Sequence, residues 1–176
     1  EKIYKNLSKI KIHEKEIGYD YDNRTLLEVF EDSKKENENI TIRVYPNLHL
    51  DDQNEILPLS GISDIKTIFC NENGFFSTYL SDRYGFNNPD YEWDKKEIDY
   101  LLIGDSYVHG ACVNRPNDVS SQIRKISKKS VLNLGYGGNG PLLEYATLRE
   151  YYNQKAKRVI WVYYEGNDLD DLNYEL

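Results

Sequence analysis

Methionine is absent from this sequence of 176 residues, and cysteine and histidine are rare, with two and three copies. The two cysteines, Cys70 and Cys112, are too few for a small disulfide-stapled scaffold, and no Cys/His spacing matches a zinc site. Two alternatives stay open for them: one disulfide bond, which would stabilise the fold by about 4 kcal/mol, or two buried thiols. Because the chain begins at Glu1 and contains no Met, we expect it to be part of a longer translation product.

Basic residues and long apolar runs are also scarce. The 22 Lys and Arg are outnumbered by 30 Asp and Glu, and the net charge of −8 disfavours nucleic acid or an anionic membrane as the partner. The longest apolar run, Val159–Tyr164, is far shorter than the roughly 20 residues of a membrane span, so we expect no span. An apolar content of 39% suffices for a packed core. The acidic composition, and a Cys70–Cys112 bridge if one forms, favour an extracytoplasmic location, periplasmic or secreted.

The N-terminal region, residues 1–96, is expected to be a β-rich extension. One helix is predicted to begin after Thr25, because Thr25 and Glu28 have the spacing of a capping box. Alternation of apolar and polar residues, together with a hairpin-like turn, indicates three short strands. These strands are predicted over residues 40–45, 65–69 and 75–80. The turn-rich segment 81–90 ends the region.

Residues 97–176 have the pattern of an α/β domain. Short, nearly continuous apolar runs are typical of strands that are covered on both faces, and the segments between them carry apolar residues at helical spacing. The strands are predicted over residues 100–103, 131–134 and 159–164, and the helices over residues 119–126 and from Pro141 onward. The order β-α-β-α-β predicts a parallel sheet with right-handed crossovers, in which ligands bind at the carboxyl ends of the strands.

A small polar cluster follows each predicted strand, at residues 104–110, 135–140 and 166–168. Because parallel strands point the same way, we expect the three clusters to meet at one edge of the sheet. Ser106 stands at a tight turn from strand to helix, where its hydroxyl would project above the sheet. A tetrahedral acyl-transfer intermediate needs hydrogen-bond donors around its oxyanion. Three are available here: the Ser106 amide, a glycine amide of the second cluster and the Asn167 side chain.

Each cluster also has a simpler explanation when it is taken alone. Asp105 and Ser106 can serve only to cap a helix, and Asn167 can be a turn residue. Residues 135–140 have the form G-x-G-x-x-G of a dinucleotide site, but they follow the second strand, and basic residues stand roughly 20 positions further on, where that site needs a carboxylate. We reject the dinucleotide interpretation. The catalytic interpretation depends on the three clusters occurring together, in this order.

The clusters resemble the first three sequence blocks of the SGNH (GDSL) hydrolase superfamily, and the resemblance covers about residues 99–168. It implies a three-layer α/β sandwich with a parallel, flavodoxin-like sheet. Matched by position, it assigns Ser106 as nucleophile and first oxyanion donor, Gly138 as second donor and Asn167 as third. Gly138 is preferred over its nearest competitor, Gly137, because its spacing within the block matches that of the family's glycine.

The activity that the resemblance implies is that of a serine esterase, acyl hydrolase or acyltransferase. The acyl group of an ester would pass to Ser106, and water or an acceptor hydroxyl would resolve the acyl-Ser106 intermediate. The implied substrate is a small-molecule or carbohydrate ester, since several members act on acylated polysaccharides of the bacterial cell envelope. No metal or organic cofactor is required. Tyr107 and Tyr136 are candidates for stacking against a sugar ring.

The chain departs from the family pattern in two ways. The family's base is a histidine of a later Asp-x-x-His block, whereas the histidines here are His13, His49 and His109, and the family's five-stranded sheet contrasts with three predicted strands. We therefore expect either an α/β domain truncated at its C-terminus or a relative without a base; the alternative function is a non-catalytic carbohydrate-binding or scaffold protein. His109 is expected at the surface or the rim of the site, with a role as substitute base as its alternative. His13 and His49 receive no catalytic role.

Overall fold

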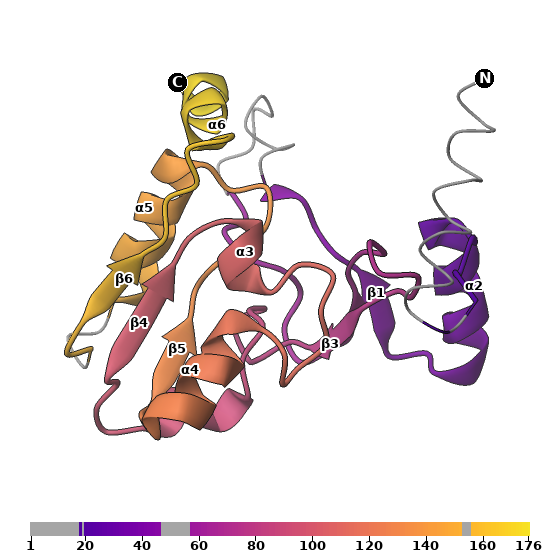
Figure 1. Cartoon of the computed structure of the whole chain (residues 1–176), viewed down its shortest axis with the longest axis horizontal. Helices are drawn as coiled ribbons and strands as arrows, with labels where there is room; N and C mark the ends of the chain where they lie inside the picture. Colours follow the sequence, from indigo (N-terminus) through magenta and orange to yellow (C-terminus); the bar gives the residue numbers. More distant parts are fainter. Residues whose placement is uncertain (1–17, 19, 47–56, 153–155) are drawn as a thin grey trace.

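The computed structural model describes residue 18 and residues 20–46, 57–152 and 156–176. Over these residues it has the predicted α/β class, with five α-helices and two small sheets (Figure 1). The elements in chain order are α2 (Leu26–Glu36), β1 (Ile40–Ile42), β2 (Lys66–Ile68), β3 (Thr78–Leu80), a 3₁₀ helix (Asp90–Asp94), β4 (Tyr100–Ile103), α3 (Ser106–His109), α4 (Val119–Ser127), β5 (Val131–Asn133), α5 (Pro141–Tyr151), β6 (Val159–Trp161) and α6 (Asp168–Glu175). No described helix combines the length and the apolar composition that a membrane crossing needs.

A mixed sheet and one helix form the N-terminal part. β1 pairs in parallel with β2, and β2 pairs antiparallel with β3. α2 begins where the sequence predicts, because the Thr25 hydroxyl accepts from the Glu28 N–H and the Glu28 carboxylate accepts from the Thr25 N–H. Val29, Ile40 and Ile68 form the buried core beneath this helix. The predicted helix and the three predicted strands are confirmed, although each strand is shorter than its alternating pattern.

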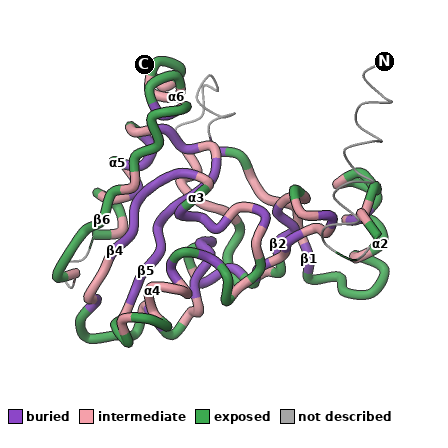
Figure 2. The backbone as a smooth tube through the Cα atoms, in the orientation of Figure 1, coloured by how far each residue is buried: buried purple, intermediate pink, exposed green. Residues whose placement is uncertain are grey.

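The second sheet is parallel and has the order β5-β4-β6, so the first of its strands along the chain lies at the centre. Leu101 and Ile103 of β4 face one core, which also contains Tyr136, whereas Leu102 faces another core with Val108. Both faces of β4 are therefore covered, as a continuous apolar run predicts. Figure 2 shows the buried backbone of β4 and β5 running through the middle of the molecule.

β6 contradicts the expectation of a strand that is covered on both faces. Val159, Ile160 and Trp161 are 42%, 38% and 42% exposed. β6 lies at the edge of its sheet and, among the described residues, pairs only with β4. A strand at an edge has one neighbouring strand instead of two, and its apolar side chains remain partly exposed to solvent. An apolar run along the chain does not reveal which strand takes the edge.

The predicted N-terminal extension is in contact with the α/β part in several places. The segment before residue 97 supplies Phe86 to the core of the parallel sheet. The Asn88 side chain forms two hydrogen bonds with the backbone of Asn133 in β5, at 2.7 and 2.9 Å. A disulfide bond joins Cys70, after β2, to Cys112, after α3. Of the two alternatives for the cysteines, the structure has the bridge.

Candidate active site

Ser106 stands at the turn between β4 and α3. The turn starts with Gly104, where a Cβ atom would lie 2.5 Å from the Val108 side chain, so only glycine fits. Asp105 then caps α3: its Oδ1 accepts from the Tyr107 N–H at 3.1 Å, and its Oδ2 accepts from the Ser106 hydroxyl at 3.3 Å. The capping role that was the simpler explanation for this motif is performed by Asp105. Ser106 remains half-buried, with its hydroxyl beside a cavity.

Asn167 is the last residue of the loop between β6 and α6 and precedes Asp168, the first residue of α6. Asp168 holds this loop in place: its buried carboxylate accepts from the Tyr164 N–H, and its own N–H donates to the Tyr164 carbonyl. The Asn167 side chain donates from Nδ2 to Asp171 Oδ2 at 2.7 Å. Because an amide nitrogen carries two hydrogens, this bond leaves one side-chain N–H of Asn167 for a ligand.

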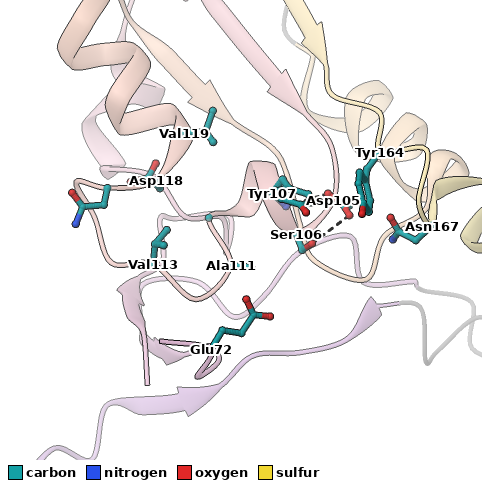
Figure 3. Close-up of a pocket in the computed structure, with 12 residues that line it drawn as sticks. Glu72, Asp105, Ser106, Tyr107, Ala111, Val113, Asp118, Val119, Tyr164 and Asn167 are labelled. Atoms are coloured by element: carbon teal, nitrogen blue, oxygen red, sulfur yellow. Dashed lines mark hydrogen bonds between the residues drawn. The ribbon is translucent and has the colours of Figure 1, made fainter. Parts of the chain in front are cut away.

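Ser106 and Asn167 line the same cavity, which has a volume of about 490 Å³. Figure 3 shows Ser106 next to Asn167 and Tyr164, with Glu72 on the opposite side of the hollow. The cavity lies at the carboxyl ends of β4 and β6, which is where the chain order of the sheet reverses. In doubly wound sheets the connections diverge at this point and open a crevice for a ligand. The other lining residues are Asp105, Tyr107, Gly110, Ala111, Val113, Asn117, Asp118 and Val119.

Gly138 lies in the loop between β5 and α5 and is not among the residues that line this cavity. It is half-buried and has a φ of +91°, which favours glycine. Within the part of the chain that the structure describes, neither the Gly138 N–H nor the Ser106 N–H donates to a protein acceptor. Both backbone donors that the sequence assigns to an oxyanion are therefore unused. Of the three predicted residues, the structure brings Ser106 and Asn167 to the cavity itself.

His109 is neither at the surface nor at the rim, contrary to the expectation from the sequence. Its ring is fully buried and stacks on Tyr136 and Phe69, with centroid distances of 4.4 and 4.2 Å. Its Nδ1 accepts from the Gly137 N–H at 3.0 Å, which fixes a neutral ring with its proton on Nε2. Burial lowers the pKa of His109 well below its usual value, and the nearby charge of Arg43 lowers it further. His109 is therefore a core residue, and the substitute base role is wrong. His13 and His49 lie outside the described residues.

The two tyrosines that the sequence suggests for stacking on a sugar differ in their exposure to solvent. Tyr136 is fully buried against His109 and Phe86, so the expectation that it stacks on a sugar is wrong. Tyr107 is 56% exposed and forms an edge-to-face pair with Tyr164, with ring centroids 5.1 Å apart. Both rings line the cavity beside Ser106. Only the structure shows that Tyr164 pairs with Tyr107 at the cavity.

The cavity is electronegative. Glu72, Asp105 and Asp118 line it, and none of its described lining residues is a lysine or an arginine. Behind Asn167, burial raises the pKa of Asp168 and of Asp171, and the charge of Asp105 raises both further. Glu72 received no role in the site from the sequence, because it belongs to the hairpin-like turn before the predicted strand 75–80. In the described residues, no group of three or more His, Cys, Asp or Glu side chains is arranged to hold a metal ion.

Comparisons with protein-family models, with curated proteins and with solved structures find no match for this chain. The resemblance to SGNH hydrolases thus consists of the three short sequence motifs.

Proposed function

We propose that this chain carries the acyl-transfer site of a serine esterase, acyl hydrolase or acyltransferase of the SGNH type. The observation that carries the proposal is the shared cavity of Ser106 and Asn167 at the carboxyl ends of β4 and β6. These residues are far apart in the sequence, and each alone would be explained by helix capping or turn formation. The parallel order β5-β4-β6 also supports the three-layer, flavodoxin-like sandwich that belongs to this proposal.

In the proposed reaction, Ser106 Oγ attacks the carbonyl carbon of an ester. The tetrahedral oxyanion accepts hydrogen bonds from the Ser106 N–H, the Gly138 N–H and the Asn167 side chain, and each donor would contribute about 3 kcal/mol of transition-state stabilisation. The bond to the alcohol then breaks and leaves an acyl-Ser106 intermediate, which water or an acceptor hydroxyl resolves. A general base takes the Ser106 proton and returns it to the leaving alkoxide.

Among the described residues, the Asp105 carboxylate is the group that accepts a hydrogen bond from the Ser106 hydroxyl. His109 is turned into the core and does not supply the base. As the general base for Ser106, the proposal therefore retains the histidine of an Asp-x-x-His block, which the resemblance implies.

The lining of the cavity supports an uncharged carbohydrate ester, with its O-acyl group directed to Ser106, as the substrate. The exposed rings of Tyr107 and Tyr164 offer apolar faces and hydroxyl groups beside the nucleophile, a combination that suits sugar rings. The acidic lining disfavours phosphorylated or other anionic esters. The same acidity disfavours nucleic acid as a partner.

The alternative function is a non-catalytic carbohydrate-binding or scaffold protein that has kept the cavity. One observation favours it: within the described residues, no histidine contacts Ser106. The disulfide bond supports an extracytoplasmic site of action for either function, because such bonds persist in oxidising compartments.

The test uses a fluorophosphonate probe, which reacts with activated serines, on the full-length protein. We expect labelling that Ser106→Ala abolishes. Ser127→Ala serves as the matched control, since Ser127 is also half-buried but lies at the end of α4, where its hydroxyl donates to the Ile123 carbonyl and accepts from the Lys129 N–H. Equal labelling of the wild type and Ser106→Ala, or none at all, would reject the enzyme. Binding of an acylated oligosaccharide without labelling, lost in Tyr107→Ala, would establish the alternative.

A further inference from the structure

The loop that carries Gly138 is held from two sides. The Gly137 carbonyl accepts a hydrogen bond from Arg43 Nη1 at 2.8 Å. The Gly137 N–H donates to His109 Nδ1 at 3.0 Å. Arg43 belongs to the N-terminal part, directly after β1, and His109 is the last residue of α3. Two segments that are distant in the sequence thus anchor successive peptide groups of this loop.

The bond from Arg43 acts on the same peptide group that contains the Gly138 N–H. The Gly137 C=O and the Gly138 N–H lie in one plane and, in a trans peptide, point in opposite directions. The guanidinium that fixes the direction of the carbonyl therefore fixes the direction of the N–H as well. Its positive charge also polarises the peptide group, which makes the N–H a stronger donor.

Arg43 is itself held in place. Its guanidinium lies over the rings of Tyr45 and Phe69, 3.9 and 4.6 Å from their centroids. A Cβ atom on Gly137 would lie 2.2 Å from Arg43 Nη1, so the guanidinium fills the space that a side chain would need. This close approach explains why residue 137 is a glycine although residue 138 has the positive φ.

We propose that Arg43 is a positioning residue of the oxyanion site, which holds the Gly137–Gly138 peptide so that the Gly138 N–H is directed at the developing negative charge. This inference rests on the proposed function, in which Gly138 supplies the second donor. On this inference the N-terminal part, which contains Arg43, contributes to the geometry of the active site. Arg43 acts through the peptide group; it is not among the residues that line the cavity.

The experiment compares Arg43→Met and Arg43→Lys with the wild type in the full-length protein. Arg115→Met is the matched control, because Arg115 Nη2 also donates to a backbone carbonyl across the two parts, that of Leu80 at 2.8 Å, while neither Arg115 nor Leu80 lines the cavity. The kinetic readout is kcat and KM for p-nitrophenyl acetate. The direct readout is the ¹⁵N chemical shift of the Gly138 amide, which responds to hydrogen bonding at the Gly137 carbonyl.

We expect Arg43→Met to lower kcat by about 10- to 100-fold with KM within about twofold of the wild type, as for a misplaced transition-state donor. Arg43→Lys should recover part of kcat, and Arg115→Met should keep wild-type kinetics. The Gly138 ¹⁵N resonance should move upfield in Arg43→Met and stay in place in Arg115→Met.

An unchanged Gly138 resonance in Arg43→Met would overturn the inference, and so would equal losses of kcat in Arg43→Met and Arg115→Met. An effect of Arg43→Met on KM alone would also overturn it. If the wild type itself hydrolyses no ester and reacts with no fluorophosphonate, the proposed function fails, and the role of Arg43 at an oxyanion fails with it. That outcome is distinguishable because it does not depend on any Arg43 variant.

Discussion

Glu144 of α5 is a buried carboxyl group whose raised pKa should make the stability of the fold decrease as the pH rises from 4.5 to about 8. It is 1% exposed, and its Oε2 accepts from the Trp161 indole N–H at 2.6 Å. Its Oε1 has no partner among the described residues. Burial, and then the carboxylates of Asp168, Asp105 and Glu175, raise the pKa of Glu144 to about 8. Glu144 is therefore mostly protonated at pH 7 in the folded protein.

The sign of the pH dependence follows from the proton count. Glu144 has a pKa of 4.5 in the unfolded chain and of about 8 in the fold. Between these two values the folded state holds one proton more than the unfolded state, so the free energy of unfolding decreases by about 1.36 kcal/mol for each pH unit. The stabilisation is complete below pH 4.5 and is lost as the pH rises through about 8. The total loss is on the order of 5 kcal/mol, which would consume much of a typical domain's stability.

The test is Glu144→Gln, followed by urea unfolding with tryptophan fluorescence at pH 5, 7 and 9. Glutamine keeps a carbonyl acceptor for the Trp161 N–H but cannot ionise. We expect both proteins to unfold with free energies within about 1 kcal/mol of each other at pH 5, and Glu144→Gln to be more stable at pH 9 by about 2 to 5 kcal/mol. Glu150→Gln, an exposed position of the same helix, is the control and should follow the wild type at every pH. Parallel stability curves for Glu144→Gln and the wild type would refute the reasoning.

Three further predictions concern the disulfide, a buried carboxylate and the charge of the cavity. Cys112→Ser opens a loop that spans 42 residues and should cost about 4 kcal/mol in urea unfolding; a cost below about 1 kcal/mol would contradict the contribution of the bridge. Asp82→Ala should lower the free energy of unfolding by about 3 to 5 kcal/mol. The buried Asp82 carboxylate accepts from the N–H groups of Tyr84 and Phe86 and from the side chains of Asn88 and Trp93, and the variant leaves these four donors without their acceptor. Thermal unfolding of the wild type and the variant at the same temperature would disprove this prediction. If the proposed function holds, Glu72→Lys should raise kcat/KM for a negatively charged ester by roughly fivefold, about 1 kcal/mol, and leave a neutral ester unchanged; equal effects on the two esters would count against an electronegative cavity.

The secondary structure was largely predictable because its signals are local. The capping box of Thr25 and Glu28, the Pro141 that opens α5 and the apolar run of β4 each lie within or next to the element that they specify. Their energetics depend on neighbours along the chain. The shared position of Ser106 and Asn167 followed from the same local signals, since the direction of parallel strands sets where their loops meet.

The errors all concern what packs against what. His109 and Tyr136 belong to polar or glycine-rich stretches of the sequence, yet both rings are buried. They are buried because Phe69 and Tyr79, from the N-terminal sheet, pack against the His109 ring. β6 has the same kind of apolar run as β4, but it takes the edge of the sheet and stays half exposed. The pattern of apolar and polar residues within one segment does not indicate which distant segment will pack against it.

The α/β class, the places of most elements and the edge of the sheet at which Ser106 and Asn167 meet could be predicted from the sequence alone, because periodicity, caps and chain direction are properties of neighbouring residues. Four features became visible only in the folded chain: His109 is a neutral core residue, Tyr107 pairs with Tyr164, Cys70 bonds to Cys112, and Arg43 holds the peptide before Gly138. These features depend on contacts between segments that are distant along the chain, and burial changes the chemistry of a side chain only after such contacts have formed.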